Sequence, residues 1–234
     1  MEEEKNTESA PTLTAGAEVK EPSSFRLIFT LGLAGFLSGV ILVSAYLYTK
    51  PLIDANKAAA IERAIYKVLP GCDSFKPLKL TNGILGEIIR KENKSNGKRE
   101  ADKLVYAGFN TSKEIIGFAV LGSEPGFQDI IKVMIGYNPK EKMIIGFEVL
   151  ESKETPGLGD KIFKDISFQK NFIALFTEPE IVFAKKGEKH NANEVEAITG
   201  ATISSKAVIR LLNNSMNEWK EPIDNYLQSR NKPH

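Results

Sequence analysis

The sequence predicts an α+β fold, in which one N-terminal transmembrane helix precedes a small antiparallel-sheet domain with flanking helices. Three observations support this prediction. Residues 27–47 contain no charged side chain, residues 104–150 hold four strand-like runs, and a helical apolar pattern follows residue 206. Helices placed before and after a group of strands are typical of an α+β domain.

The N-terminal 49 residues divide into a polar tail and a membrane helix. Residues 1–24 are polar and net acidic, which predicts a disordered tail. We expect the transmembrane helix at 25–49, because its 21 uncharged positions are long enough to cross a hydrocarbon core of about 30 Å. A cleaved signal peptide is the alternative. The apolar run exceeds a signal-peptide core, and the preceding residues are acidic, which favours a retained anchor.

Composition restricts the kind of chemistry that we expect. The chain has 31 basic and 30 acidic residues, a balance that does not indicate binding to nucleic acid. Cys72 is the sole cysteine, and His190 and His234 are the only histidines. We therefore expect neither an intramolecular disulfide nor a metal site. Any redox chemistry would come from a bound organic cofactor.

Residues 50–102 are predicted to hold a linker helix and the start of the extramembrane domain. Apolar residues recur at helical spacing from Pro51 to Leu69, and Pro70-Gly71 ends this pattern. Residues 91–103 are highly charged, which predicts an exposed loop.

Residues 103–234 are predicted to form the main domain. Its strand-like runs make two hairpins, which are expected at 104–109 with 115–121 and at 130–137 with 143–150.

Two loops of this domain are candidates for contact with a cofactor. Between the hairpins, residues 123–129 hold a glycine and Phe127, an aromatic side chain that either packs on a flat ring or closes the core edge. After the last strand comes a segment in which glycine permits tight turns and close approach to a planar ligand. This segment reads Glu154-Thr155-Pro156-Gly157-Leu158-Gly159-Asp160-Lys161.

The stretch from Glu196 to Ser205 leads into the C-terminal helix. It contains Thr199-Gly200-Ala201-Thr202, in which the two small residues leave the Thr202 hydroxyl accessible. Ser204 and Ser205 are residues of the type that caps a helix, so the local pattern alone describes a capped helix after a glycine turn. The same position also suits a phosphate, because a helix N-terminus favours anions.

These two motifs together resemble the FMN-binding domain family. Thr199-Gly200-Ala201-Thr202 is similar to its flavinylation motif, and residues 154–161 match a second family segment. With one N-terminal span, the chain resembles the G subunits of Rnf-type ion-translocating oxidoreductases, and next the C subunits of sodium-pumping NADH:quinone reductases. One departure is Glu196, where the family usually has Asp.

The resemblance implies a role for each motif residue. FMN would be bound covalently through a phosphoester to Thr202. Thr199 and Ser205 would be candidates for hydrogen bonds to phosphate or ribityl oxygens, and Lys161 for balancing negative charge. The remaining residues implied to contact the cofactor are Gly200, Ala201, Ser204, Phe127, Glu154, Thr155, Pro156, Gly157, Leu158 and Gly159. No residue is assigned a catalytic role.

The resemblance also implies partners and a location. The chain would relay electrons between ferredoxin and NAD⁺ within a membrane complex, and it would not be a complete enzyme alone. A separate flavin transferase would attach FMN from FAD with Mg²⁺. The chain would span the bacterial inner (cytoplasmic) membrane once, with the tail in the cytoplasm and the main domain on the periplasmic, extracytoplasmic side. An anchored FMN-binding sensor or regulator, and a tethered scaffold with purely structural motifs, stay open as alternatives.

Overall fold

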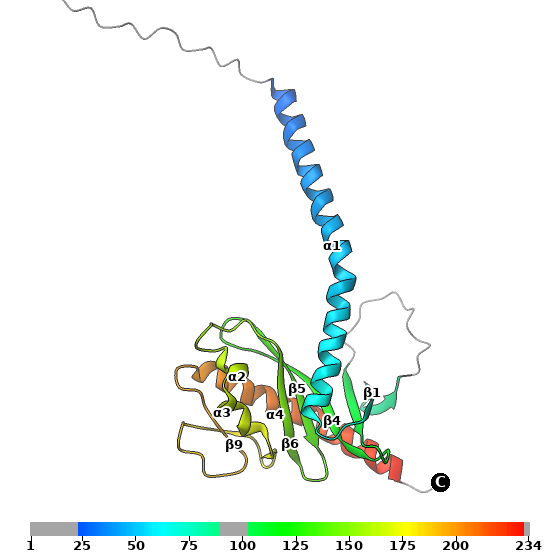
Figure 1. Cartoon of the computed structure of the whole chain (residues 1–234), viewed down its shortest axis with the longest axis vertical. Helices are drawn as coiled ribbons and strands as arrows, with labels where there is room; N and C mark the ends of the chain where they lie inside the picture. The colour runs from blue at the N-terminus through cyan, green and yellow to red at the C-terminus, as the bar shows by residue number, and fades with distance from the viewer. Residues whose placement is uncertain (1–22, 89–102, 232–234) are drawn as a thin grey trace, which may run out of the picture. The chain divides into compact units, whose positions relative to one another are not determined.

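The computed structural model describes residues 23–88 and 103–231 (Figure 1). The tail expected at 1–24 falls outside them except for its last two residues, and the charged loop expected at 91–103 except for its last residue. The chain divides into two units, Met1–Asp54 and Ala55–His234.

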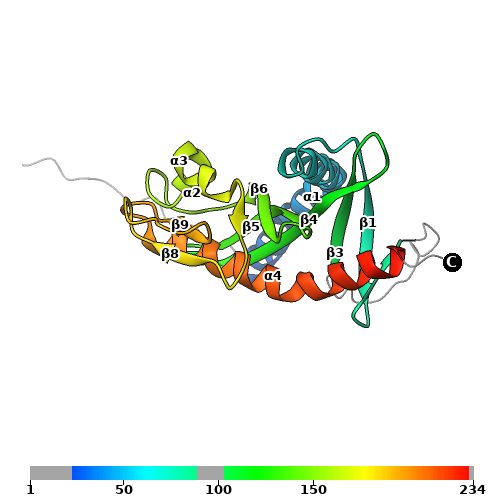
Figure 2. The same ribbon diagram turned by 90° about the horizontal axis from the view of Figure 1, so that it is seen from below.

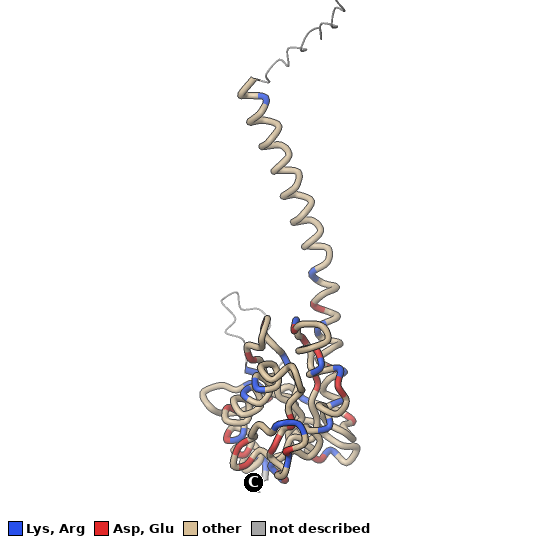
Figure 3. Tube along the Cα trace, turned by 90° about the vertical axis from the view of Figure 1, so that its left-hand side faces the viewer, with Lys and Arg blue, Asp and Glu red and all other residues tan. Residues whose placement is uncertain are grey.

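The first helix, α1, runs from Ser24 to Val68 and contains Pro51. The sequence predicts a span at 25–49 and a separate helix from Pro51, whereas one helix includes both. Its apolar part is exposed and has a mean hydropathy of 2.2 over 18 residues, so it is long and apolar enough to cross a membrane. Figure 3 shows this part as a run without Lys, Arg, Asp or Glu.

A seven-stranded antiparallel sheet forms the framework of the second unit, in the order β2-β1-β3-β4-β5-β6-β7. The four predicted strands are confirmed as its centre and extend by up to four residues at their ends. The strands are β1 (Ser74–Thr81), β2 (Ile84–Glu87), β3 (Leu104–Phe109), β4 (Ile115–Pro125), β5 (Ile130–Asn138), β6 (Met143–Glu151) and β7 (Leu175–Phe176).

The hairpin of β1 and β2 was not predicted from the sequence. Its strands pair through Thr81 and Ile84 around the two-residue turn Asn82-Gly83, and both turn residues have positive φ. Asn-Gly flanked by strand residues is the strongest short hairpin signal, so the sequence did contain a sign of this element.

The long C-terminal helix α4 (Thr202–Asn231) packs along one face of the sheet, as Figure 2 shows. The apolar positions predicted for its buried side are confirmed, because Val208, Leu211, Leu212, Met216 and Trp219 are all at most 3% exposed. They pack with the inward side chains of the sheet in the main core.

The end of α1 packs on the other face of the sheet. Ala64, Ile65 and Val68 form a second core with Ala119 and Met134. The helix approaches closely because Gly136 and Gly146 are paired across β5 and β6. A Cβ on either glycine would overlap the backbone carbonyl of Val68.

Short elements between β6 and α4 bring the connecting loops to one end of the sheet. They are α2 (Lys161–Lys164), α3 (Ile166–Gln169), the 3-10 helix η1 (Lys170–Phe172), and the parallel strands β8 (Val182–Ala184) and β9 (Glu194–Glu196). The chain then turns at Gly200 into α4.

Candidate functional site

Thr202 is the first residue of α4, and it is exposed. The preceding turn is closed by the Ala201 N–H, which donates to the Ile198 carbonyl at 3.0 Å, and Gly200 has a φ of 82°. Glycine suits this left-handed conformation, which L-residues adopt at a cost. The turn therefore leaves the Thr202 residue exposed at a helix N-terminus, where unpaired N–H groups favour an anion.

Ser204 and Ser205 do not cap α4, contrary to the local sequence prediction, because the helix begins two residues before Ser204. Both side chains are buried. The Ser205 hydroxyl donates to the Ala201 carbonyl at 2.9 Å and accepts from the Ile198 N–H at 3.1 Å. Ser205 therefore fixes the turn before Thr202 from within the protein.

The 154–161 segment lies beside the threonine motif. Gly157 has a φ of 79°, and the Leu158 N–H donates to the Thr155 carbonyl at 3.2 Å, which makes a tight turn. A Cβ built on Gly200 would lie 3.5 Å from Leu158 Cδ2. The tertiary structure thus brings together two motifs separated by about forty residues in the sequence.

Glu154 joins three segments at this site. Its Oε1 accepts hydrogen bonds from the backbone N–H groups of Phe127, at 2.9 Å, and Gln128, at 3.0 Å. Its Oε2 accepts the hydroxyl of Ser204. The loop after β4, the loop after β6 and the first turn of α4 therefore meet at one buried carboxylate.

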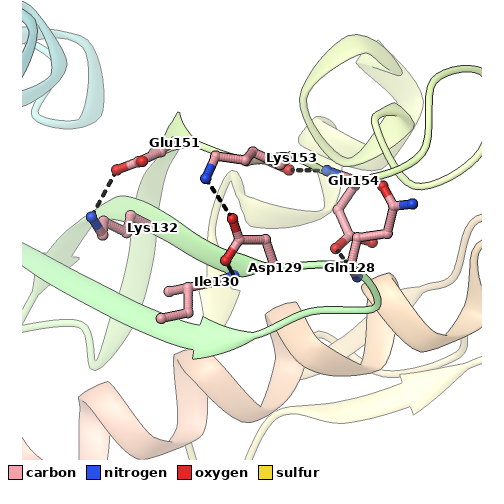
Figure 4. Close-up of polar contacts among 8 residues, drawn as sticks. Gln128, Asp129, Ile130, Lys132, Glu151, Lys153 and Glu154 are labelled. Atoms are coloured by element: carbon pink, nitrogen blue, oxygen red, sulfur yellow. Dashed lines mark hydrogen bonds and ion pairs between the residues drawn. The ribbon is translucent and has the colours of Figure 1, made fainter. Parts of the chain in front are cut away.

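Ion pairs reinforce the junction of β5 and β6 next to Glu154 (Figure 4). Lys153 Nζ lies 2.7 Å from Asp129, and Lys132 Nζ lies 2.7 Å from Glu151. The hydrogen bond from Lys153 lowers the pKa of Asp129, and the hydrogen bond from Lys132 lowers the pKa of Glu151. Both carboxyl groups therefore stay ionised to a lower pH than they would without the lysines.

Three exposed apolar side chains lie on the three segments that Glu154 joins. Phe127 is 62% exposed, Leu158 48% and Ile203 53%. With this exposure Phe127 does not close the core edge, which is what an aromatic residue in a loop more often does. Exposed apolar surface beside a helix N-terminus, which in general favours anions, suits a ligand with a flat ring and a phosphate.

Lys161 and Thr199 line one small polar cavity of about 90 Å³. The sequence motifs identified both residues, but they did not identify Lys186 and Asn171, which line the same cavity. Lys186 and Asn171 belong to neither motif, so no local signal in the sequence could have found them. The fold alone brings them to the cavity that Lys161 lines.

Glu196, the departure from the family pattern, has a structural role. Its side-chain Oε1 accepts the backbone N–H of Gly187, and its own N–H donates to Asn171 Oδ1 at 3.1 Å. The glutamate therefore ties the loop after β8 to β9, just before the threonine motif.

Comparison with known proteins finds a family domain over this part of the chain. Residues 126–217 match the FMN-binding domain family, a range that includes the Phe127 loop, the 154–161 segment and Thr202. Two solved structures share the fold, with TM-scores of 0.53 and 0.50. They are the C subunit of the Na⁺-translocating NADH-quinone reductase from Parabacteroides distasonis, 19% identical over 73% of this chain and 95% of that one, and NqrC from Shewanella oneidensis, 20% identical over 71% and 86%.

The curated relatives are G subunits of ion-translocating complexes. The G subunit of the ion-translocating oxidoreductase complex of Methanosarcina acetivorans is 27% identical, covering 82% of this chain and 92% of the relative. The G subunit of the proton-translocating ferredoxin:NAD⁺ oxidoreductase complex of Clostridium ljungdahlii is 30% identical, covering 80% and 87%. The chain therefore belongs to the family of G subunits of ion-translocating oxidoreductase complexes.

Proposed function

We propose that this chain is a membrane-anchored flavoprotein subunit that relays electrons in an Rnf-type ion-translocating complex, with FMN held as a phosphoester on Thr202. One observation carries the proposal. Thr202 offers an exposed hydroxyl at the first residue of α4, beside the turn of the 154–161 segment.

The residues around Thr202 fit FMN. The N-terminus of α4 favours the phosphate, which stays anionic after esterification. Lys161 and Thr199 line a small polar cavity. We assign these two residues to contacts with the polar groups of FMN. Phe127 and Leu158 supply exposed apolar surface for a flat ring. Bound FMN supplies redox chemistry with one or two electrons, and the chain holds and orients it.

A separate flavin transferase would make the attachment. The Thr202 oxygen attacks the FMN phosphorus of FAD, the new Oγ–P bond forms, and the P–O bond to the AMP part breaks. AMP leaves, and the hydroxyl proton passes to a base of the transferase. The chain's contribution is to present the hydroxyl without steric hindrance, which Gly200 and Ala201 allow.

Partners and orientation complete the proposal. The anchor is the apolar part of α1, and the partners are other membrane subunits of the complex, with ferredoxin and NAD⁺ as its electron donor and acceptor. We place the N-terminus in the cytoplasm and the FMN-binding domain outside. Covalent attachment would prevent loss of the cofactor from this location.

Intact mass of the protein from its native membrane tests the attachment. We expect a mass increase equal to one FMN phosphoester, and flavin fluorescence that survives denaturing electrophoresis. Thr202→Val should remove both without unfolding the domain. Thr111→Val, a change of the same kind at the turn between β3 and β4, should leave both unchanged.

Covalent flavin that persists in Thr202→Val would contradict the assignment of the site. Co-purification tests the partner assignment separately, because an isolated sensor or regulator would carry FMN without other redox subunits. Recovery of the flavinylated chain alone under gentle solubilisation would favour that alternative.

A further inference from the structure

We propose that Glu154 is a positioning residue, whose buried carboxylate holds the start of α4, with Thr202, against the loop that carries Phe127. The proposal rests on the proposed function, because it concerns attachment of FMN at Thr202. Glu154 would then act by positioning other residues of the protein, and it would not contact the cofactor itself.

The contacts of Glu154 support this role. The residue is 5% exposed, and its carboxylate accepts hydrogen bonds from Phe127, Gln128 and Ser204. Within residues 23–88 and 103–231 it forms no ion pair with a Lys or Arg. A buried carboxylate without a cation depends on its hydrogen bonds, so these three donors are strongly constrained in position.

Two glycines provide the space that the Glu154 carboxylate occupies. Neither Gly126 nor Gly159 has a left-handed φ, so the backbone conformation does not require glycine. A Cβ on Gly159 would lie 2.7 Å from Glu154 Oε2 and 2.9 Å from Ser204 Oγ, and a Cβ on Gly126 would overlap Glu154 Oε1. The approach of Glu154 and its partner Ser204 therefore accounts for Gly159, and at Gly126 it acts together with Ile131, whose Cδ1 would lie 2.8 Å from the new Cβ.

The position of Ser204 connects this cluster to the attachment site. Ser204 lies in the first turn of α4, two residues after Thr202. Holding the Ser204 hydroxyl therefore fixes the direction in which the first turn presents Thr202. Holding the Phe127 N–H fixes the loop that carries its exposed ring. Glu154 thus sets the attachment point and one side of the ring site relative to each other.

The test measures the initial rate of flavin attachment to the full-length chain, co-expressed with its transferase. Covalent fluorescence per chain is followed over time, and Tm is measured for every variant. We expect Glu154→Ala to slow attachment by about tenfold, because it leaves buried donors without partners. Glu154→Gln should recover most of the rate, because its amide oxygen accepts the N–H groups and its amide nitrogen donates to Ser204.

Two controls separate positioning from general damage. Glu221→Gln changes an exposed carboxyl of the same kind in the C-terminal half of α4 and should leave the rate unchanged. Leu78→Ala removes a buried side chain on β1 and should lower Tm without slowing attachment. A Glu154→Ala rate equal to wild type, or slowed only as much as in a variant of equal Tm, would overturn the proposal.

Ser204→Ala and Gly126→Ala keep the proposal testable if Glu154→Ala does not fold. Ser204→Ala should slow attachment several-fold. Both changes should speed hydrogen exchange at the Phe127 and Gln128 amides, and unchanged exchange with an unchanged rate would contradict the proposal. Absence of covalent FMN from the wild-type chain would instead contradict the proposed function.

Discussion

Single residues at this site have functions that their type alone does not reveal. Gly157 and Gly200 are favoured by a left-handed backbone, whereas Gly159 makes room for Glu154, and Gly126 makes room for both Glu154 and Ile131. The sequence predicted that glycine permits close approach in the 154–161 segment. It did not identify the Glu154 carboxylate as a group that comes close, because that contact joins segments far apart in the chain.

Gly200→Ala and Gly157→Ala should each lower the free energy of unfolding by about 1 kcal/mol. Both positions have φ near 80°, and a new Cβ meets at most an ordinary contact of 3.5 Å, so backbone strain is the main cost. Urea denaturation of the two variants measures this loss in the free energy of unfolding. Gly86→Ala, on the edge strand β2 with open space around it, is the control. Equal stability of all three variants would contradict this explanation.

At the scale of elements, the fold depends on how closely helices approach the sheet. The periodicity of residues 208–219 predicted which side of α4 is buried, because that pattern is local. The contact of α1 with Gly136 and Gly146 was not predicted, since the two glycines belong to different strands. Their alignment requires the register of β5 and β6.

Gly136→Ala and Gly146→Ala should destabilise the second unit by about 1–3 kcal/mol or more, because the new methyl group would overlap the Val68 carbonyl. The Val68 carbonyl belongs to the backbone, so it cannot rotate away from the new methyl group as a side chain could. Thermal unfolding measures the loss. A Tm within one degree or so of wild type would show that α1 does not pack here as described.

The junction of β5 and β6 should become less stable in acid. The pKa values of Asp129 and Glu151 are lowered from their ordinary values of 3.8 and 4.5 by Lys153 and Lys132. Their contribution is therefore complete above those values and is lost as pH falls through the lowered pKa values. Tm measured from about pH 6 to about pH 2 should fall in the acid part of that range, and less steeply in Asp129→Asn. If Tm depended on pH in Asp129→Asn as it does in wild type, the role of the Lys153–Asp129 pair would be contradicted.

At the scale of the whole molecule, the two units are suited to different surroundings, lipid for the first and water for the second. Residues 24–54 of α1 are all exposed, and they include the uncharged run at 27–47, which suits a lipid environment and not water. The second unit has its own two cores and mixes Lys and Arg with Asp and Glu.

Leu37→Arg should weaken membrane insertion, because a charge at the centre of a span costs about 2.5–3.5 kcal/mol. Tyr48→Arg, near the end of the apolar run, should have little effect, since the long side chain can reach the interface. The fraction of chain that stays in the membrane pellet after alkaline extraction measures the difference. Equal retention of both variants would argue against a span centred near residue 37.

The sequence by itself determined the apolar span, the four central strands, the buried side of α4 and the two motifs of the candidate site. Each of these follows from local spacing or from a continuous motif. Tertiary structure alone decided that the motifs lie side by side, that Ser204 binds Glu154 instead of capping α4, and that Lys186 lines a cavity with Lys161. These contacts join residues far apart in the chain, so they exist only after the sheet has set its register and brought its loops to one end.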